Sequence, residues 1–220
     1  MQHINKKGLS YMDSIQVIEQ RSNAWHELRR GKVTASRVAD ILAKTKTGAS
    51  ASRQNYLIEL ALQRVTGQIE ESYTNAAMAW GTENEPKARM AYEVFNNVLV
   101  EQVPFVDHPT IKGFGASPDG LVNADGLCEI KCPNSATHWS YLKSGEPPNK
   151  YFIQMQVQLA CIQRDWNDFI SYDPRMPERS QLFVKRVFRD DTFIGIMEDE
   201  VKKFLEEVQQ ETELMLSREI

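Results

Sequence analysis

The sequence predicts an α/β fold in which a central mixed β-sheet is flanked by helices. Helical spacing of apolar residues dominates the N-terminal part, short apolar runs between turn residues fill the middle, and helix and strand patterns follow toward the C-terminus. The chain has 220 residues, of which 41% are hydrophobic and 25% charged, as is ordinary for a globular protein. We therefore expect residues 1–220 to form a single domain.

The first helices are predicted from their start and stop signals. Ser22 is placed to cap a helix that ends before a turn at Gly31, and Thr34 or Ser36 is placed to cap a second, short helix. The polar run over residues 44–54 then predicts a loop.

Two longer helical patterns follow this loop. Apolar residues recur at helical spacing over residues 56–66 and again over roughly 75–96. Because Gly81 and Pro86 lie inside the second pattern, we expect that helix to be broken or to start late.

The middle of the chain predicts β-structure. Residues 98–106 have a strand pattern, and residues 113–132 read as short strands joined by turns at 118–120 and 125–126. The remaining expected elements are a helix over 149–163, strands over 166–174 and 180–188, and a long amphipathic helix that begins near Phe193.

Composition restricts the possible functions and locations. The 26 Lys and Arg residues against 30 Asp and Glu residues give a net charge of −4, which disfavours a protein that coats nucleic acid by bulk charge. No apolar run is long enough to span a membrane, and the N-terminus lacks the apolar core of a signal peptide. The three cysteines form no zinc-type CxxC pair, so we expect a protein of the reducing cytoplasm with no membrane partner.

One short motif has the spacing of a catalytic site. Glu129 and Lys131 are two residues apart on a predicted strand, so their side chains share one face, and Asp119 lies in a turn that can reach the same point. Two carboxylates and a backbone carbonyl are hard oxygen ligands that suit Mg²⁺ or Mn²⁺, and a neighbouring lysine can position the attacking water. The motif predicts hydrolysis at phosphorus.

The alternative is purely structural. In that interpretation Asp119 is a turn residue beside Gly120, while Glu129 and Lys131 belong to an exposed strand face. For an isolated match of this length the structural interpretation is favoured, because the motif is short and uses common residues.

Further blocks of sequence support the catalytic interpretation. They are AWHELRRGKVTAS (24–36), AWGTENE (79–85), SPDGL (117–121), EIKCP (129–133), YFIQMQ (151–156) and YDPRM (172–176). On these blocks the chain resembles the lambda-exonuclease-type, YqaJ-like viral recombination nucleases, whose site is a PD-(D/E)xK motif. The resemblance implies a restriction-endonuclease-like fold and a Mg²⁺-dependent exonuclease that degrades one strand of duplex DNA from its 5′ end.

The resemblance also implies roles for individual residues at the cleavage site. Asp119, Glu129 and the Ile130 backbone carbonyl would ligate two Mg²⁺ ions, with Mn²⁺ as a substitute, and Lys131 would serve the attacking water. Glu85 matches an additional acid of the metal site. Gln154 matches a glutamine that orders the site, although Gln156 and Gln158 leave the register open.

A pocket for the 5′ phosphate is implied as well. Arg29, Ser36 and Ser117 match it, whereas Thr137 stands where the family has a second arginine, so either the Thr137 hydroxyl or neighbouring His138 would contribute. Met78 matches an apolar wedge that separates the terminal base pair, and the alternative for this residue is a buried core methionine.

The function implied is resection of linear duplex DNA ends for phage-type homologous recombination. The product, a 3′ single strand, would pass to a single-strand annealing protein, and the enzyme would be a ring-shaped homotrimer. Two alternatives remain: a DNA endonuclease of the same fold without end preference, and a DNA-binding module without catalysis.

Overall fold

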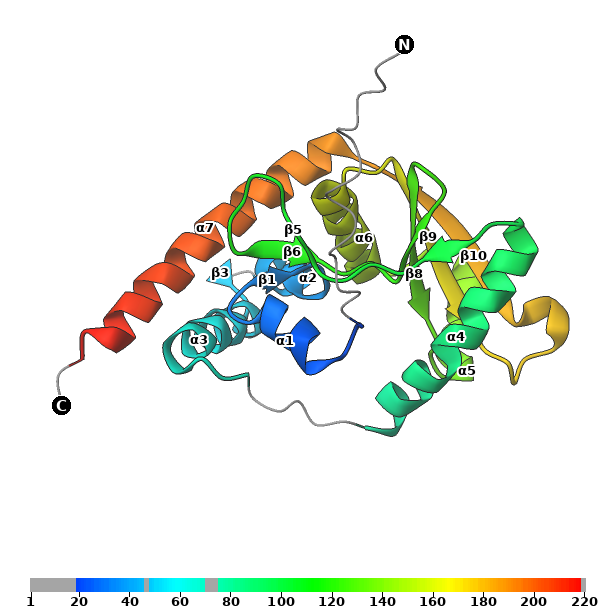
Figure 1. Cartoon of the computed structure of the whole chain (residues 1–220), viewed down its shortest axis with the longest axis horizontal. Helices are drawn as coiled ribbons and strands as arrows, with labels where there is room; N and C mark the ends of the chain where they lie inside the picture. Colours follow the sequence, from blue (N-terminus) through cyan, green and yellow to red (C-terminus); the bar gives the residue numbers. More distant parts are fainter. Residues whose placement is uncertain (1–18, 46–47, 70–74, 219–220) are drawn as a thin grey trace, which may run out of the picture.

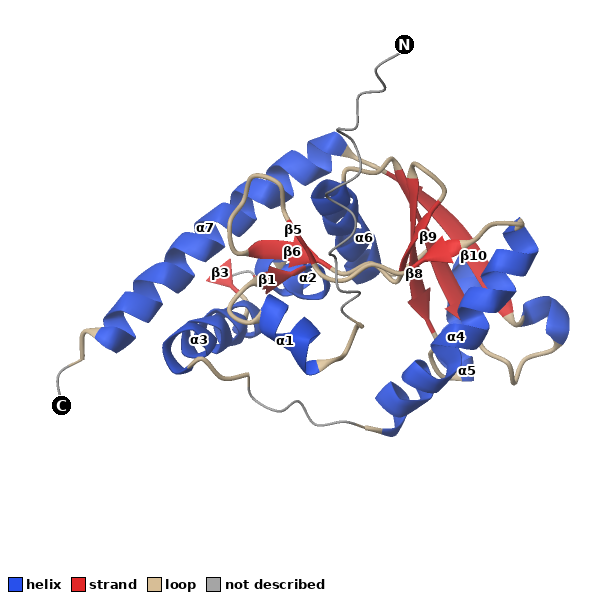
Figure 2. Cartoon of the chain, in the orientation of Figure 1, coloured by secondary structure: helices blue, strands red, loops and turns tan. Residues whose placement is uncertain are grey.

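The computed structural model describes residues 19–45, 48–69 and 75–218, and a mixed sheet dominates one side of the molecule (Figures 1 and 2). Its elements, in chain order, are α1 (Asn23–Arg29), β1 (Val33–Thr34), η1 (Ala35–Arg37), α2 (Val38–Leu42), β2 (Lys44–Thr45), β3 (Gly48–Ala49), α3 (Ala51–Thr66), α4 (Ala76–Asn96), β4 (Val100–Glu101), β5 (Val106–Asp107), β6 (Phe114–Ala116), β7 (Gly120–Val122), β8 (Gly126–Lys131), α5 (Ser135–Ser144), α6 (Asn149–Ile162), β9 (Trp166–Tyr172), η2 (Glu178–Ser180), β10 (Leu182–Phe188) and α7 (Asp191–Leu216). The predicted α/β class is confirmed.

The main sheet has five strands in the order β10-β9-β8-β7-β4. Within this sheet, the one parallel pair among the described strands is β8 with β9, and the helices α5 and α6 form the crossover between them. A smaller sheet, β1-β6-β5, lies on the helical side of the molecule. Among the described residues, no helix is long and apolar enough to cross a membrane.

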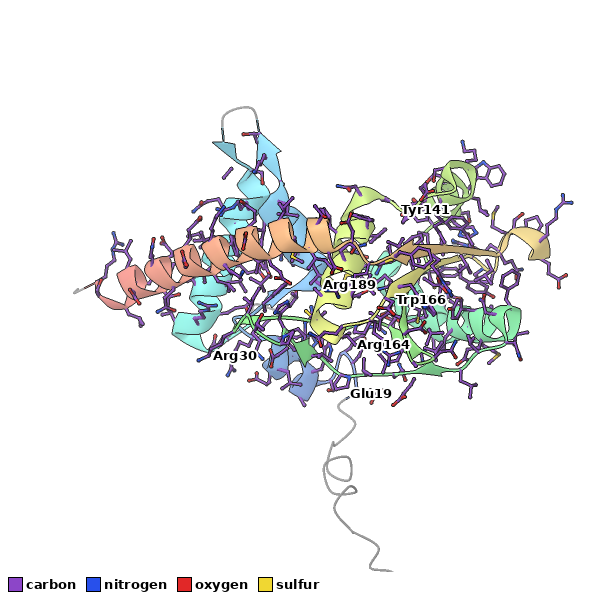
Figure 3. All side chains as sticks on the ribbon, turned by 90° about the horizontal axis from the view of Figure 1, so that it is seen from above. Glu19, Arg30, Tyr141, Arg164, Trp166 and Arg189 are labelled. Carbon is purple, nitrogen blue, oxygen red and sulfur yellow. The ribbon has the colours of Figure 1, made fainter. Side chains whose placement is uncertain are left out.

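Helices cover both faces of the main sheet. Ala88 and Tyr92 of α4 pack against Cys128 and Ile130 of β8, whereas Tyr141 of α5 packs on the opposite face with α6 (Figure 3). Because side chains alternate along a strand, Glu129 and Lys131 face away from α4 and toward α6. The burial pattern of the sheet therefore decides which helix meets the catalytic candidates.

The helical side has its own core around α3 and α7. Tyr56 stacks on Phe204 of α7 with ring centroids 5.5 Å apart, and Arg53 makes a bidentate ion pair with Glu207 at 2.7 and 2.9 Å. These contacts fix the two helices side by side, as Figure 1 shows.

The predicted loop over 44–54 was wrong in its second half. The α3 helix begins at Ala51, because the Ser50 hydroxyl accepts a hydrogen bond from the Arg53 N–H at 3.2 Å and the Arg53 side chain is held by α7. In the first half, Lys44–Thr45 pairs with Gly48–Ala49.

The predicted break in the helix over 75–96 was also wrong. The α4 helix is continuous through Gly81 and Pro86, and the Asn75 side chain caps it by accepting from the Met78 N–H at 3.0 Å. Pro86 is exposed, so the carbonyl that loses its helical partner lies on the solvent side and can bond water.

Three local details differ from the sequence prediction. The α2 helix follows η1 directly, and neither Thr34 nor Ser36 caps it. The strand expected over 98–106 is divided between β4 and β5, which belong to different sheets. The α5 helix was not predicted; Asn134 caps it at one end and Gly145, with φ +69°, at the other.

A buried carboxylate joins the sheet to α4. Asp168 of β9 is 1% exposed; it accepts hydrogen bonds from the Tyr92 hydroxyl at 2.7 Å and, from the neighbouring strand, from Arg186 Nε and Nη2 at 2.9 Å each. The Arg186 guanidinium also lies 3.4 Å from the centre of the Trp166 ring. The buried negative charge of Asp168 is thus neutralised by Arg186, and both of its oxygens accept hydrogen bonds.

We expect Arg186→Met to lower the free energy of unfolding by about 2–3 kcal/mol, because Asp168 would keep only the Tyr92 hydroxyl as a partner. The control is Lys185→Met, which removes an exposed ion pair with Glu146 and should cost less than about 0.5 kcal/mol. Urea unfolding measures both. Equal losses in the two variants would contradict the importance of the buried pair.

Candidate active site

Glu129 is the buried centre of the predicted catalytic group. Its side chain is 1% exposed and accepts a hydrogen bond from the Lys131 ammonium on the same strand face. The α6 helix supplies two further donors, Gln154 Nε2 at 2.7 Å and Gln158 Nε2 at 2.5 Å. The predicted sharing of one face by Glu129 and Lys131 is confirmed.

The glutamines of α6 divide between two faces of the helix. Gln154 and Gln158, four residues apart, both face Glu129, whereas Gln156 donates to the Phe188 carbonyl and accepts from the Asp190 N–H. Gln158 was not among the predicted site residues. The helical period links positions 154 and 158, but sequence alone does not say which face meets the sheet.

Asp119 lies immediately before the first residue of β7, Gly120. Its N–H donates to the Cys128 carbonyl at 3.1 Å, and its Oδ2 accepts from the Ile130 N–H at 2.6 Å. Because the N–H and C=O of a strand residue point to the same side, the Ile130 carbonyl faces the Asp119 side as well. This places two carboxylates and one carbonyl near one point.

The electrostatics of this group favour a cation. Burial, and next the Glu129 charge, raise the pKa of Asp119 to about 8. Burial by itself lowers the pKa of Lys131, but Glu129 and Asp119 outweigh it and raise that pKa above its ordinary value. Two crowded carboxylates beside a carbonyl are hard donors that suit Mg²⁺, which fills its remaining positions with water and substrate oxygens.

Glu85 of α4 stands at the edge of this group. Its carboxylate bonds to Arg21 and, at 3.3 Å, to Arg89, and its charge contributes to the raised pKa of Asp119. Within the described residues no three His, Cys, Asp or Glu side chains are grouped closely enough to hold a metal by themselves. The two arginines were not predicted, and no motif marks them.

Arg29 lies in a separate small cavity of about 210 Å³, which Ser36 also lines. Its guanidinium lies 3.7 Å from the centre of the Trp25 ring and forms no hydrogen bond or ion pair with the described residues. Burial lowers the pKa of Arg29 to about 10, so it remains a cation at neutral pH. An unpaired, partly buried guanidinium is suited to an anion.

Ser117 connects this cavity to the cleavage group. The Trp25 indole N–H donates to the Ser117 hydroxyl at 3.0 Å, and Ser117 lies two residues before Asp119. Gln20 also donates to the Pro118 carbonyl at 2.8 Å. The N-terminal segment is therefore fastened to the loop that carries Asp119.

Thr137 and Met78 lie apart from the Arg29 cavity. Thr137 is in the first turn of α5 and does not line that cavity. The alternative that His138 contributes to the pocket is wrong, because His138 is fully buried and its ring nitrogens bond to Ser171 Oγ and the Ser180 carbonyl. Met78 is 47% exposed, so the alternative of a buried core methionine is also wrong.

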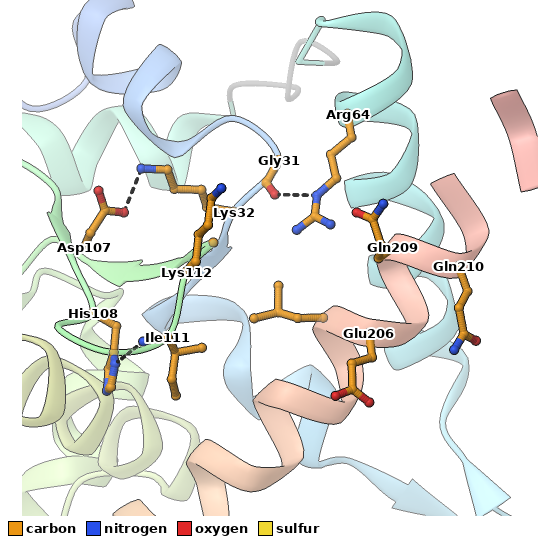
Figure 4. A pocket seen from close by; sticks show the side chains of 12 residues that line it. Gly31, Lys32, Arg64, Asp107, His108, Ile111, Lys112, Glu206, Gln209 and Gln210 are labelled. Atoms are coloured by element: carbon orange, nitrogen blue, oxygen red, sulfur yellow. Dashed lines mark hydrogen bonds and ion pairs between the residues drawn. The ribbon is translucent and has the colours of Figure 1, made fainter. Parts of the chain in front are cut away.

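A larger cavity, of about 930 Å³, opens elsewhere on the molecule, between the α1–β1 turn, the β5–β6 loop and α7 (Figure 4). Arg64 crosses its wall and donates to the Gly31 carbonyl at 3.0 Å. None of the predicted site residues lines this cavity, so it is separate from both the cleavage group and the Arg29 cavity.

The raised pKa of Asp119 affects stability when no divalent cation is present. A carboxyl with a higher pKa in the folded state stabilises the fold when protonated; this stabilisation is complete below its ordinary pKa of 3.8 and is lost as the pH rises through about 8. In EDTA, we therefore expect Asp119→Asn to raise the urea midpoint, and to raise it more near about pH 9 than near about pH 5.

The control for that measurement is Asp125→Asn. Asp125 is exposed in the turn between β7 and β8, so its replacement should change the midpoint little at either pH. A shift for Asp119→Asn that is the same at both pH values would contradict the electrostatic account.

The chain is similar to one protein family and to several solved structures. The family model for the YqaJ-like viral recombinase domain matches residues 24–165. The alkaline exonuclease LHK-Exo from Laribacter hongkongensis is 51% identical with a TM-score of 0.83, and its complex with dAMP is 52% identical with a TM-score of 0.84; each comparison covers 88% of this chain and 96% of that chain.

Two more distant relatives add less. A phage related exonuclease from Haemophilus somnus 129PT shares the fold, at 16% identity and a TM-score of 0.64 over 84% of this chain and 95% of that chain. The uncharacterized protein R354 of Acanthamoeba polyphaga mimivirus is 27% identical over 175 residues, which are 74% of this chain; the chain spans only 30% of that protein. The family match and the similarity to the alkaline exonuclease structures together show that this chain belongs to the YqaJ-like viral recombinase family of nucleases.

Proposed function

We propose that this protein is a Mg²⁺-dependent exonuclease that degrades one strand of linear duplex DNA from the 5′ end. The observation that carries the proposal is the group formed by the buried Glu129 with Lys131 and Asp119 at the end of β8, beside the Ile130 carbonyl. The 52% identity to an alkaline exonuclease supports the reaction class.

Each residue of this group has a defined task. Asp119, Glu129 and the Ile130 carbonyl would hold Mg²⁺, and Glu85 would be the additional acid for a second ion. When bound, the metal supplies a Lewis acid at the phosphate and lowers the pKa of water. Lys131 is an ammonium group that positions the attacking water and offsets charge on the phosphate.

The two α6 glutamines keep Glu129 in one orientation. Gln154 donates to one carboxylate oxygen and Gln158 to the other, so the carboxylate is restrained at both ends. Asn167 in turn donates to Gln158 Oε1 at 2.7 Å, which fixes the amide of Gln158. A metal ligand held in this way reorganises little during the reaction.

The Arg29 cavity would bind the 5′ phosphate. Its guanidinium would pair with the phosphate oxygens, and Ser36, which also lines the cavity, would add a hydroxyl donor. Ser117 bonds to Trp25 of this cavity and lies two residues before Asp119, so it would fix the distance between the bound phosphate and Asp119. Thr137 lies on α5 and does not line this cavity, so it has no part in the proposed pocket.

Separation of the strands would follow from an exposed apolar side chain. Met78 protrudes near the start of α4, where it can wedge against the terminal base pair. The remaining 3′ strand would pass to a single-strand annealing protein, and the enzyme would be a homotrimer that encircles the duplex, as the resemblance implies. This arrangement would serve phage-type recombination in the bacterial cytoplasm.

Digestion of duplexes labelled separately at each 5′ and 3′ terminus tests the proposal. With Mg²⁺, label at the 5′ ends of linear DNA should be released first, and EDTA should stop the reaction. Cleavage of circular duplex as fast as linear duplex would instead favour an endonuclease without end preference.

In the same assay, Lys131→Ala should reduce hydrolysis by a factor on the order of 10³ while DNA binding is retained, because the metal ligands remain. Lys150→Ala is the matched control: Lys150 is exposed and lies 4.7 Å from the Tyr151 ring, which Lys131 approaches at 5.1 Å. Full activity of the Lys131 variant would refute the site.

Arg29→Ala should slow initiation at 5′-phosphorylated ends by roughly tenfold to a hundredfold and should affect 5′-hydroxyl ends much less. Arg30→Ala is the control, because Arg30 is exposed and pairs only with Glu27 and the Gly67 carbonyl among the described residues. Single-turnover rates on the two kinds of end provide the measurement. Equal losses on both would argue against a phosphate pocket.

A further inference from the structure

The side chains in the first turn of α4 make few contacts with the rest of the molecule. The side chains of residues 75–79 are all exposed, and Trp80 is the first side chain of the helix that is partly buried. Trp80 Nε1 is buried without a hydrogen-bond partner among the described residues, so no hydrogen bond fixes the indole ring. A contact that holds the Trp80 ring therefore also holds the N-terminal turn of α4 in place.

Arg175 lies on that ring. Its guanidinium carbon is 4.1 Å from the centre of the Trp80 ring, a distance at which an arginine and a tryptophan attract each other. Arg175 lies between β9 and η2, far from Trp80 in sequence. The contact joins the N-terminal part of α4 to the loop after β9.

The Arg175 side chain is itself held by several bonds. Arg175 Nε and Nη2 donate to the two oxygens of Asp173 at 2.7 and 3.0 Å, and the Arg175 N–H donates to Asp173 Oδ1 at 3.0 Å. Asp173 is fully buried; burial would raise its pKa, but the hydrogen bonds from Arg175 and one from Ser135 lower it to about 2. The pair is therefore ionised throughout the neutral range.

A fourth hydrogen bond of Arg175 ties this group to the cleavage site. Arg175 Nη2 also donates to the Pro133 carbonyl at 3.2 Å, and Pro133 lies two residues after Lys131. One guanidinium thus contacts the segment after β8, the end of β9 and the first half of α4.

We propose that Arg175 is a positioning residue that holds the start of α4 against the end of β8 and thereby sets where Met78 stands relative to Lys131. This inference rests on the proposed function, in which Met78 is the wedge. Met78 and Trp80 are two residues apart on a helix, so their side chains point about 200° apart, and anchoring Trp80 directs Met78 outward. Its 47% exposure agrees with that direction.

The test compares two 5′-phosphorylated duplexes that differ only in whether the terminal base pairs are formed or already mismatched. Arg175→Gln and Trp80→Leu should slow initiation at the paired end on the order of tenfold, because a misplaced wedge melts the end poorly. The mismatched end should restore most of the rate. Trp80→Phe, which keeps an aromatic face under Arg175, should stay near the wild-type rate on both ends.

Two further variants make the result specific. Arg179→Gln, at an exposed position in η2, is the matched control and should not change either rate. Arg29→Ala should not be rescued by the mismatched end. Trp80→Leu leaves the Asp173–Arg175 pair intact, so it remains informative if the loss of Arg175 prevents folding, which urea unfolding would reveal.

Met78→Ala separates this inference from the proposed function. If Met78→Ala shows the rescuable defect and Trp80→Leu shows none, or is slowed equally on both ends, the role of Arg175 is refuted while the wedge stands. If Met78→Ala itself shows no difference between the ends, the wedge and the positioning role both fail. A double variant Met78→Ala/Trp80→Leu should be no slower than Met78→Ala alone.

Discussion

The structure of the site depends on one buried carboxylate. Glu129 is almost completely removed from water, and an unpaired charge there would cost several kcal/mol. Lys131, Gln154 and Gln158 provide its partners, so β8 and α6 must meet in one register for the fold to be stable. The crossover that joins the parallel strands β8 and β9 contains this same helix. The connection between the parallel strands and the hydrogen bonds of Glu129 therefore both require α6 to lie against β8.

The candidate metal ligands lie where β8 extends beyond the end of its shorter partner strand, β7. The β7 strand pairs with β8 only as far as Gly120 and Cys128, and β8 continues for three residues beyond that point. The free backbone of Ile130 is bonded by the Asp119 side chain instead of by a strand. The end of a short strand thus creates a position where a carboxylate and a carbonyl face the same space, beside Glu129.

Polar contacts also connect the parts of the site that lie on different elements. Trp25 bonds to Ser117, which relates the Arg29 cavity to the Asp119 loop. Arg175 relates α4 to the end of β8. Contacts of this kind are directional, so they fix relative positions more narrowly than apolar packing does. A nuclease that acts at a terminus needs such fixed spacing between its end-binding and cleavage groups.

The sequence by itself determined the α/β class, most helices, and the shared face of Glu129 and Lys131, because periods of 3.6 and 2 residues are local properties of the chain. It also placed Asp119 in a turn and gave the family. Only the tertiary structure decided which α6 glutamines meet Glu129, that α4 runs unbroken through Pro86, and that Arg21 and Arg89 bond Glu85. Those outcomes depend on which surfaces are buried together, and burial is a property of the whole fold that no local pattern contains.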